Sequence, residues 1–158
     1  MKTLSILLLA LILSACANNP TNRMISGDVT LYERLGELEG ITTVVDNLLF
    51  ELGDNNLLLP YFAETNIDRF REKLIEQLCE VSDGPCEYTG DSMVDTHAGM
   101  EMDDRHFNSL VTDLVKAMTD AKVPVGAQND LLARLAPMHD EVVNARRYRD
   151  DESLTPRF

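Results

Sequence analysis

The sequence predicts a single all-helical domain over residues 30–144, and three observations support this fold class. Apolar residues recur three and four positions apart in several segments, which is the spacing of one face of a helix. No segment alternates apolar and polar residues as a half-buried strand does. Residues that start or stop helices, such as Asn66 and Gly53, stand at the ends of the apolar stretches. We therefore expect several one-sided helices packed around a shared interior.

The N-terminus predicts a signal peptide, residues 1–15, followed by a lipid attachment site. The apolar run from Leu4 to Leu13 is too short to span a bilayer. It ends in the letters LSAC, which resemble the lipobox of bacterial lipoproteins and imply cleavage before Cys16 and acylation of that cysteine. An ordinary secretory signal that happens to end in cysteine is the alternative. By analogy with lipoprotein sorting, Ala17 favours an outer-membrane anchor that faces the periplasm.

Two polar segments flank the predicted domain. Residues 16–29 are rich in Asn, Pro, Thr and Ser and lack an apolar period, so they predict a flexible tether. Residues 145–158 are charged and aperiodic, which is typical of a frayed tail. The chain has a formal net charge of -13 and no basic stripe, so nucleic acid is a poor partner.

The first half of the domain predicts four helical elements. Thr30 and Glu33 form the pattern of a capping box, which opens a short helix that ends at Gly36. The apolar stripe of the next helix comprises Ile41, Val44, Val45, Leu48, Leu49 and Leu52. Residues 57–62 include a proline and allow only one short helical turn. Asn66 is the expected N-cap of the fourth element. The apolar face of that helix comprises Ile67, Phe70, Leu74, Leu78 and Val81.

Cys79 and Cys86 flank the turn-forming triplet DGP at 83–85. An even pair of cysteines in an exported chain favours a disulfide. Closing so small a loop should stabilise the domain by roughly 2 to 3 kcal/mol in the chain-entropy model. A pair of zinc thiolates is the alternative, but the neighbouring sequence offers no further ligands.

The second half predicts one very short helix and two longer ones. The irregular stretch after Cys86 leaves room for about two turns of helix around residues 93–97. The next helix covers about residues 103–121, with an apolar stripe of Phe107, Leu110, Val111, Leu114, Val115 and Met118. The last helix has the stripe Leu131, Leu132, Leu135, Met138, Val142 and Val143. Pro137 should bend its axis.

His97 is the strongest candidate for a functional residue. It lies among apolar neighbours in the part of the domain with the least regular structure, although a core histidine bonded to a backbone carbonyl explains it equally simply. His106 and His139 have acidic neighbours and are expected in solvent. The HxxxH and HExxH spacings of zinc sites do not occur, and no serine or cysteine stands in a nucleophile motif. Haem, in contrast, needs one axial imidazole beside a large apolar cleft.

The order of several segments resembles the group I truncated haemoglobins. The matching stretches are LYERLGELEGITTVVDNLLFEL (31–52), PYFAETNIDRFREKLIEQL (60–78), YTGDSMVDTHAG (88–99) and HFNSLVTDLVKAM (106–118). The resemblance covers Leu31 to about Val143, which is essentially the whole domain. It implies a two-over-two helical sandwich around haem b, iron protoporphyrin IX. The cofactor would then fill the sparsely structured middle of the domain.

The resemblance also implies roles for single residues. His97 would bind the haem iron through one ring nitrogen, with the other nitrogen donating to a backbone carbonyl. Phe62 would stack on the porphyrin edge. The remaining wall of the slot would comprise Phe70, Leu74, Met93, Phe107 and Leu135, each of which also fits a plain core position. Lys73 stands where the family often has a cation near a haem propionate, and a solvated lysine explains it equally well.

The distal side, opposite His97, departs from the family pattern. The family usually has a tyrosine and a glutamine there, and those places fall at Leu49 and Leu74, beside Phe70. Leucine cannot donate a hydrogen bond. Losing one hydrogen bond to a charged group costs about 1.5 to 3 kcal/mol, or one to two decades in oxygen dissociation. Gln77 follows one turn later, but helical spacing places it off the ring-facing side.

Two loop corners also depart from the family pattern. Glycine pairs expected there are reduced to Gly36 with Glu37 and to Gly84 with Asp83.

The sequence therefore predicts a lipid-anchored, haem-binding truncated globin that binds oxygen, nitric oxide or carbon monoxide at a five-coordinate iron. Nitric oxide dioxygenation is the enzymatic alternative. It would need an external electron donor, because the chain has no flavin or nicotinamide fingerprint. A haem-free lipoprotein interaction module is the third interpretation.

Overall fold

The computed structural model describes residues 29–154. The predicted signal peptide, the lipidation site at Cys16, nearly all of the predicted tether and the last four residues of the tail lie outside this described part. Within residues 29–154, no helix combines the length and the apolar character that crossing a bilayer requires.

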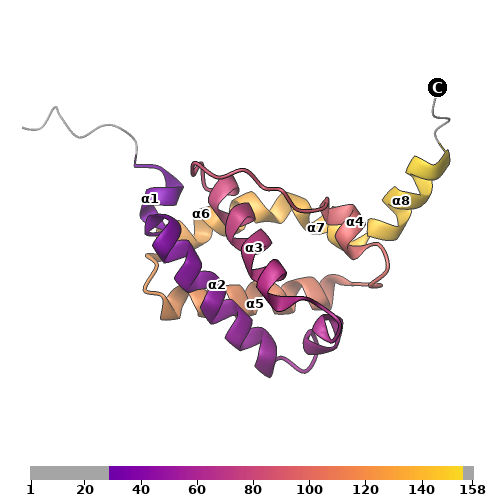
Figure 1. Ribbon diagram of the computed structural model, residues 1–158, viewed down its shortest axis with the longest axis horizontal. Coiled ribbons are helices and arrows are strands. Elements are labelled where there is room, and N and C mark those ends of the chain that lie inside the picture. The colour runs from indigo at the N-terminus through magenta and orange to yellow at the C-terminus, as the bar shows by residue number, and fades with distance from the viewer. Residues whose placement is uncertain (1–28, 155–158) are drawn as a thin grey trace, which may run out of the picture.

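The described residues form helices joined by loops, with no strand between residues 29 and 154 (Figure 1). The elements are α1 (Leu31–Arg34), α2 (Glu37–Asp54), the 3-10 turn η2 (Leu59–Phe62), α3 (Ile67–Val81), α4 (Met93–His97), α5 (Asp104–Asp120), α6 (Val125–Leu135), the 3-10 turn η3 (Ala136–Met138), α7 (His139–Val143) and α8 (Ala145–Leu154). The all-helical fold class predicted from apolar spacing is therefore confirmed.

The hydrophobic core lies where α2 packs against both α3 and α5. Helix α2 supplies the largest share of it, because its stripe turns inward as the helical spacing predicts. The buried residues of that stripe are Ile41, Val44, Val45, Leu48 and Leu52. Leu78, Met118 and Leu131 complete the centre from α3, α5 and α6. Leu49 belongs to the same stripe but is only partly buried, so this edge of α2 faces away from the densest packing.

Local signals at the helix starts act as the sequence predicts. Thr30 and Glu33 form a complete capping box, in which the Glu33 backbone N–H donates to Thr30 Oγ1 at 3.2 Å and the Thr30 backbone N–H donates to the Glu33 carboxylate at 2.7 Å. Asn66 caps α3 by accepting from the Arg69 backbone N–H at 3.0 Å. These side chains satisfy backbone donors that the first turn of a helix leaves without partners.

The C-terminal third differs from the sequence-based expectation in two ways. Pro137 interrupts the last long helix and does not merely bend it, since the missing N–H breaks the hydrogen-bond ladder into α6, η3 and α7. The expected frayed tail from residue 145 is helical as far as Leu154. The composition is polar, but Ala145 is only 2% exposed, and α8 packs against α4 and α7, so tertiary contacts order a segment that propensity alone does not.

The two substituted glycine corners take the left-handed backbone conformation. Glu37 has φ 57° and Asp83 has φ 62°, although both carry a Cβ. A left-handed non-glycine residue costs about 1 to 2 kcal/mol. At the second corner, Arg134 forms an ion pair with Asp83 at 2.6 Å, which offsets part of that cost. The chain therefore keeps the turn geometry of a glycine corner without the glycine.

Candidate functional site

His97 is the last residue of α4, and one of its ring nitrogens is fixed by the helix itself. Nδ1 lies 2.7 Å from the carbonyl oxygen of Met93, one turn earlier, so Nδ1–H donates and Nε2 keeps its lone pair. Nε2 has no hydrogen-bond partner among residues 29–154. Burial lowers the pKa of His97, against the smaller opposite effect of the Met93 carbonyl. The ring is therefore neutral at pH 7 and presents one nitrogen suited to a metal.

A set of apolar side chains is left only partly buried inside the domain. Phe62 of η2 and Phe70 of α3 lie together, with ring centroids 5.0 Å apart and planes tilted by 49°. Leu49, Leu74 and Leu135 pack against the core on one side only. Met93 and Phe107 are likewise partly exposed. Large apolar groups with one uncovered side are typical of a cofactor slot, because a well-packed core would bury them on every side.

Leucines occupy the places of the family's usual hydrogen-bond donors, and the tyrosines and glutamines elsewhere in the chain have other partners. The sequence has four tyrosines, and each hydroxyl is engaged: with the Leu38 N–H (Tyr32), His106 Nε2 (Tyr61), the Asp91 carbonyl (Tyr88) and the Asp140 carboxylate (Tyr148). Gln128 donates to the Val123 carbonyl at 2.9 Å. The other glutamine, Gln77, places its amide 3.5 Å from Met93 Sδ and 3.7 Å from Met138 Sδ. It therefore contacts both α4 and η3.

Lys73 is held on the surface of α3 by carboxylates of its own helix. Nζ donates to Glu76 at 2.8 and 3.0 Å and to Thr89 Oγ1 at 2.6 Å, with Glu72 at 3.3 Å. The Lys73 ammonium and the Thr89 backbone N–H lower the pKa of Glu76 to about 2. Lys73 is therefore already paired, and an anion that approached it would have to compete with Glu76.

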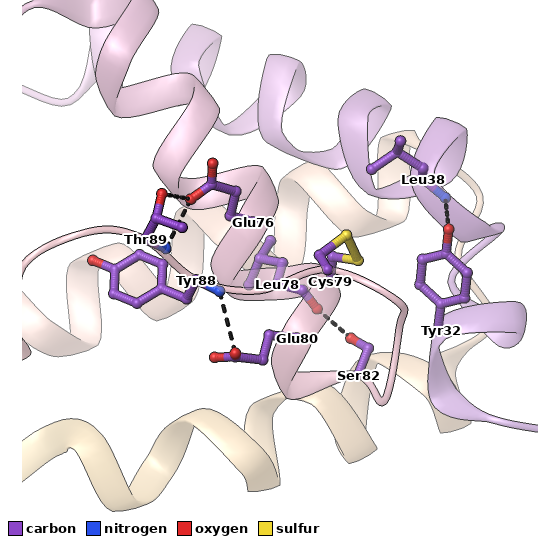
Figure 2. Close-up of a disulfide and its surroundings, with 10 residues drawn as sticks. Tyr32, Leu38, Glu76, Leu78, Cys79, Glu80, Ser82, Tyr88 and Thr89 are labelled. Atoms are coloured by element: carbon purple, nitrogen blue, oxygen red, sulfur yellow. Dashed lines mark hydrogen bonds between the residues drawn. A yellow bond between two sulfur atoms is a disulfide. The ribbon is translucent and has the colours of Figure 1, made fainter.

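A disulfide and backbone-to-carboxylate hydrogen bonds connect the segment between α3 and α4 to α3 (Figure 2). Cys79 and Cys86 form a disulfide, with Cα atoms 5.7 Å apart. Further on, the Tyr88 backbone N–H donates to Glu80 at 3.2 Å and the Thr89 backbone N–H donates to Glu76 at 3.0 Å. These contacts hold the segment that leads into α4, the helix that ends in His97.

Of the other two histidines, both expected in solvent, His106 is buried, whereas the His139 side chain is 40% exposed. His106 is buried between Asp103 and Tyr61, with Nδ1 2.5 Å from the Asp103 carboxylate and Nε2 3.2 Å from the Tyr61 hydroxyl. His139 lies 2.9 Å from Asp104 and packs edge-on against Phe107 at 4.7 Å. The expectation for His106 fails because its ring bonds both Asp103 and Tyr61. His139 bonds Asp104, 35 residues away, and not an acidic neighbour in sequence. The sequence did contain a signal for the bond between Asp103 and His106, because the two residues have the spacing of a capping box.

The chemistry of this residue set fits a haem. It combines a neutral imidazole with one uncommitted nitrogen, a partly uncovered wall of phenylalanine and leucine, and a cation on the adjoining surface of α3. Among the described residues, no group of three or more His, Cys, Asp or Glu side chains could hold a bare metal ion. The single imidazole therefore suits a metal that arrives with most of its ligands already supplied.

Comparisons with known proteins agree with this chemistry. The model of the bacterial-like globin family matches residues 30–144. Group 1 truncated hemoglobin GlbN from a Nostoc species is 32% identical over 115 residues, which cover 73% of this chain and 98% of that protein. The protein of the same name from Mycolicibacterium paratuberculosis is 30% identical and covers 72% and 83% of the two chains.

Solved structures agree at the level of the fold. Truncated hemoglobin from Tetrahymena pyriformis superposes with a TM-score of 0.70 at 20% identity, covering 72% of this chain and 97% of that one. The 2/2 hemoglobin from a Synechococcus species, solved with covalently attached heme, gives 0.69 at 17% identity over 73% and 98% of the two chains. With the two-over-two helical fold and the family match over residues 30–144, the chain belongs to the bacterial-like globins, as a group 1 truncated haemoglobin.

Proposed function

We propose that the protein binds haem b through Nε2 of His97 and takes up a diatomic gas on the opposite face of the haem. The observation that carries the proposal is the state of the His97 ring, in which Nδ1 is committed to the Met93 carbonyl and Nε2 has no partner in the described part of the chain. The globin family binds haem and gas ligands in general, which supports the same assignment. When bound, haem iron supplies an open coordination position for oxygen, nitric oxide or carbon monoxide.

The chain's own residues then orient the ring and exclude water. Phe62 and Phe70 would pack against the porphyrin, and the uncovered sides of Leu74, Leu135, Met93 and Phe107 would complete the slot. The Met93 carbonyl keeps the His97 ring in one tautomer and one orientation. Lys73 is the cation we assign to a propionate, in competition with Glu76.

The distal side is proposed to be poor in hydrogen-bond donors. Leu49 and Leu74 cannot donate, and all the tyrosines and glutamines of the chain have other partners. Oxygen gains most from a donor, because it carries partial negative charge when it is bound. Oxygen should therefore leave quickly, whereas carbon monoxide and nitric oxide should be affected less. This pattern favours gas binding or exchange over long-term oxygen storage.

Nitric oxide dioxygenation is the alternative activity, and the distal leucines weigh against it. It would also need electrons from a separate donor, since the sequence lacks flavin and nicotinamide motifs. Stopped-flow consumption of nitric oxide in the presence of a chemical reductant separates the two functions. Fast consumption of nitric oxide would show that the protein catalyses dioxygenation and does not only bind gas.

We further propose that the mature protein is anchored in the outer membrane through lipid on Cys16 and faces the periplasm. The LSAC motif after a short apolar run supports the anchor, and a disulfide in the globin domain is typical of an oxidising compartment. Mass spectrometry of the protein from membranes tests it: the expected N-terminal peptide begins at an acylated Cys16. A protein whose chain begins before residue 16 and carries no lipid would contradict the anchor.

An absorption spectrum of the reduced protein, with and without carbon monoxide, tests haem binding. We expect a Soret band that shifts with carbon monoxide and that His97→Ala weakens or abolishes. His139→Ala is the matched control, because it removes a different imidazole that is bonded to Asp104, and it should keep the haem. A wild type that folds cooperatively but stays colourless when haem is supplied would refute the proposal and favour a haem-free interaction module.

A further inference from the structure

Helix α8 lies beyond the part of the chain that the globin family accounts for. The family match ends at residue 144, and α8 covers Ala145–Leu154. The Nostoc relative is matched over 98% of its own length, so a helix of this kind is not part of the shared domain. In Figure 1, α8 leaves the body beside α4 and α7 and runs outward to the C-terminus, at the opposite end of the molecule from α1.

The start of α8 is fixed by a set of contacts with α7. Asp140 of α7 accepts hydrogen bonds from the Tyr148 hydroxyl and from Asn144 Nδ2, the latter at 2.5 Å. These two donors lower the pKa of Asp140, so its carboxylate stays ionised near neutral pH. Ala145 is 2% exposed and Val142 8% exposed, so the junction between the two helices is closed against the domain. The exposed Tyr148–Asp140 contact and the buried junction therefore link the start of α8 to α7.

From that position α8 packs against α4, the helix that ends in His97. Ala98, directly after His97, is 5% exposed, and Arg146 of α8 lies 3.8 Å from Glu101. The ion pair is exposed on both sides and adds little. The packing of α8 against α4, beside the buried Ala98 and Ala145, is the stronger restraint.

Helix α4 depends on such neighbours for its position. It has only five residues, and a helix of that length is not stable by itself. The Gln77 amide contacts it through Met93, and α7 and α8 pack against it, although none of its own five residues is fully buried. Loosening α4 would move the Met93 carbonyl and the His97 ring together, since they are joined by one hydrogen bond.

We propose that α8 is a strap that positions His97 against the haem iron, with Tyr148 as its positioning residue. This inference rests on the proposed haem ligation by His97. It adds that a segment outside the globin domain determines how firmly that ligand is held. Ligands whose supporting contacts are removed lose on the order of tenfold to a hundredfold in metal affinity.

The test compares three forms of the haem-loaded protein: the full mature chain, a chain that stops after Leu154, and a chain that stops after Asn144. We measure the rate of haem loss to excess apomyoglobin and the iron–histidine stretching frequency of the reduced protein by resonance Raman spectroscopy. The chain that stops after Leu154 should match the full chain. Without α8, haem loss should be on the order of tenfold faster or more, and the stretching band should shift or broaden.

Tyr148→Phe in the full chain covers the case in which the shortened protein fails to fold. It removes only the hydroxyl that reaches Asp140, and we expect the same changes in smaller size. Tyr32→Phe is the matched control, because its hydroxyl bonds the Leu38 N–H near α1 and should change neither quantity.

Two results would overturn the inference, and they are distinguishable. An unchanged stretching band and unchanged haem loss without α8, even with a lower unfolding midpoint, would make α8 a general stabiliser and leave haem binding intact. Failure of the full chain to bind haem would overturn the proposed function and the strap together.

Discussion

The disulfide between Cys79 and Cys86 offers the sharpest quantitative test of the structure. The two cysteines have a sequence separation of 7, so the bridge closes a loop of about eight residues. In the chain-entropy model, a loop of that size destabilises the unfolded chain by about 2.5 kcal/mol at 25 °C. With an unfolding entropy of about 2.1 cal/mol/K per residue, the loss of the bridge should lower the unfolding midpoint of the domain by roughly 8 to 10 °C.

The appropriate assays are thermal unfolding, for the shift of the midpoint, and urea unfolding, for the free energy, of the haem-free protein, oxidised and after reduction with a phosphine. Reduction retains both sulfur atoms, whereas Cys79→Ala also removes a side chain that is completely buried. The double variant Cys79→Ala/Cys86→Ala should therefore be at least as destabilised as the reduced wild type. Thiol titration confirms that the bridge has opened. If the oxidised and fully reduced proteins unfold at the same urea concentration, the entropic argument fails for this loop.

Three further predictions concern single side chains. Leu49→Tyr should slow oxygen release by about one to two decades relative to Leu49→Phe, which adds similar bulk without a donor; equal stopped-flow rates would mean that this part of α2 does not face the ligand. Because the pKa of Glu76 is about 2 in the folded protein against an ordinary 4.5, its contribution to stability is present above pH 4.5 and is lost as the pH falls toward 2. Glu76→Gln should flatten that part of an acid-unfolding curve followed by circular dichroism, and an unchanged curve would contradict the Lys73 pairing. Burial lowers the pKa of His97, so the unfolded chain takes up that proton first and the haem-free domain should lose stability as the pH falls below 6.5. Urea midpoints measured across this range should change less in His97→Phe than in the wild type, and equal slopes would show that His97 is accessible to water.

Local patterns were sufficient for the elements whose start signals are local. The capping box at Thr30, the N-cap at Asn66 and the apolar stripe of α2 all predict helices that the structure contains. These features involve side chains within one or two turns of one another, so they can be recognised from the sequence. The resemblance to truncated haemoglobins also identified the two corners where Glu37 and Asp83 replace glycine, and both residues are left-handed in the structure.

Expectations failed where the deciding partner is distant in sequence. His106 was expected in solvent, but Tyr61, 45 residues earlier, closes over it. The tail from residue 145 was expected to fray, but α4 gives α8 a surface to pack on. A charged, aperiodic sequence does not indicate such a partner. The helix is ordered by the packing of Ala145 and not by a repeating apolar pattern.

The sequence alone determined that this protein is a helical globin domain and that His97 is its candidate ligand, since helical period, caps and the order of a few motifs are properties of neighbouring residues. Only the tertiary structure decided that one nitrogen of His97 is committed to Met93, that every tyrosine hydroxyl has a hydrogen-bond partner, and that α8 packs against the short helix that ends in His97. Those facts depend on groups brought together from remote parts of the chain, and burial determines which of their hydrogen bonds are made.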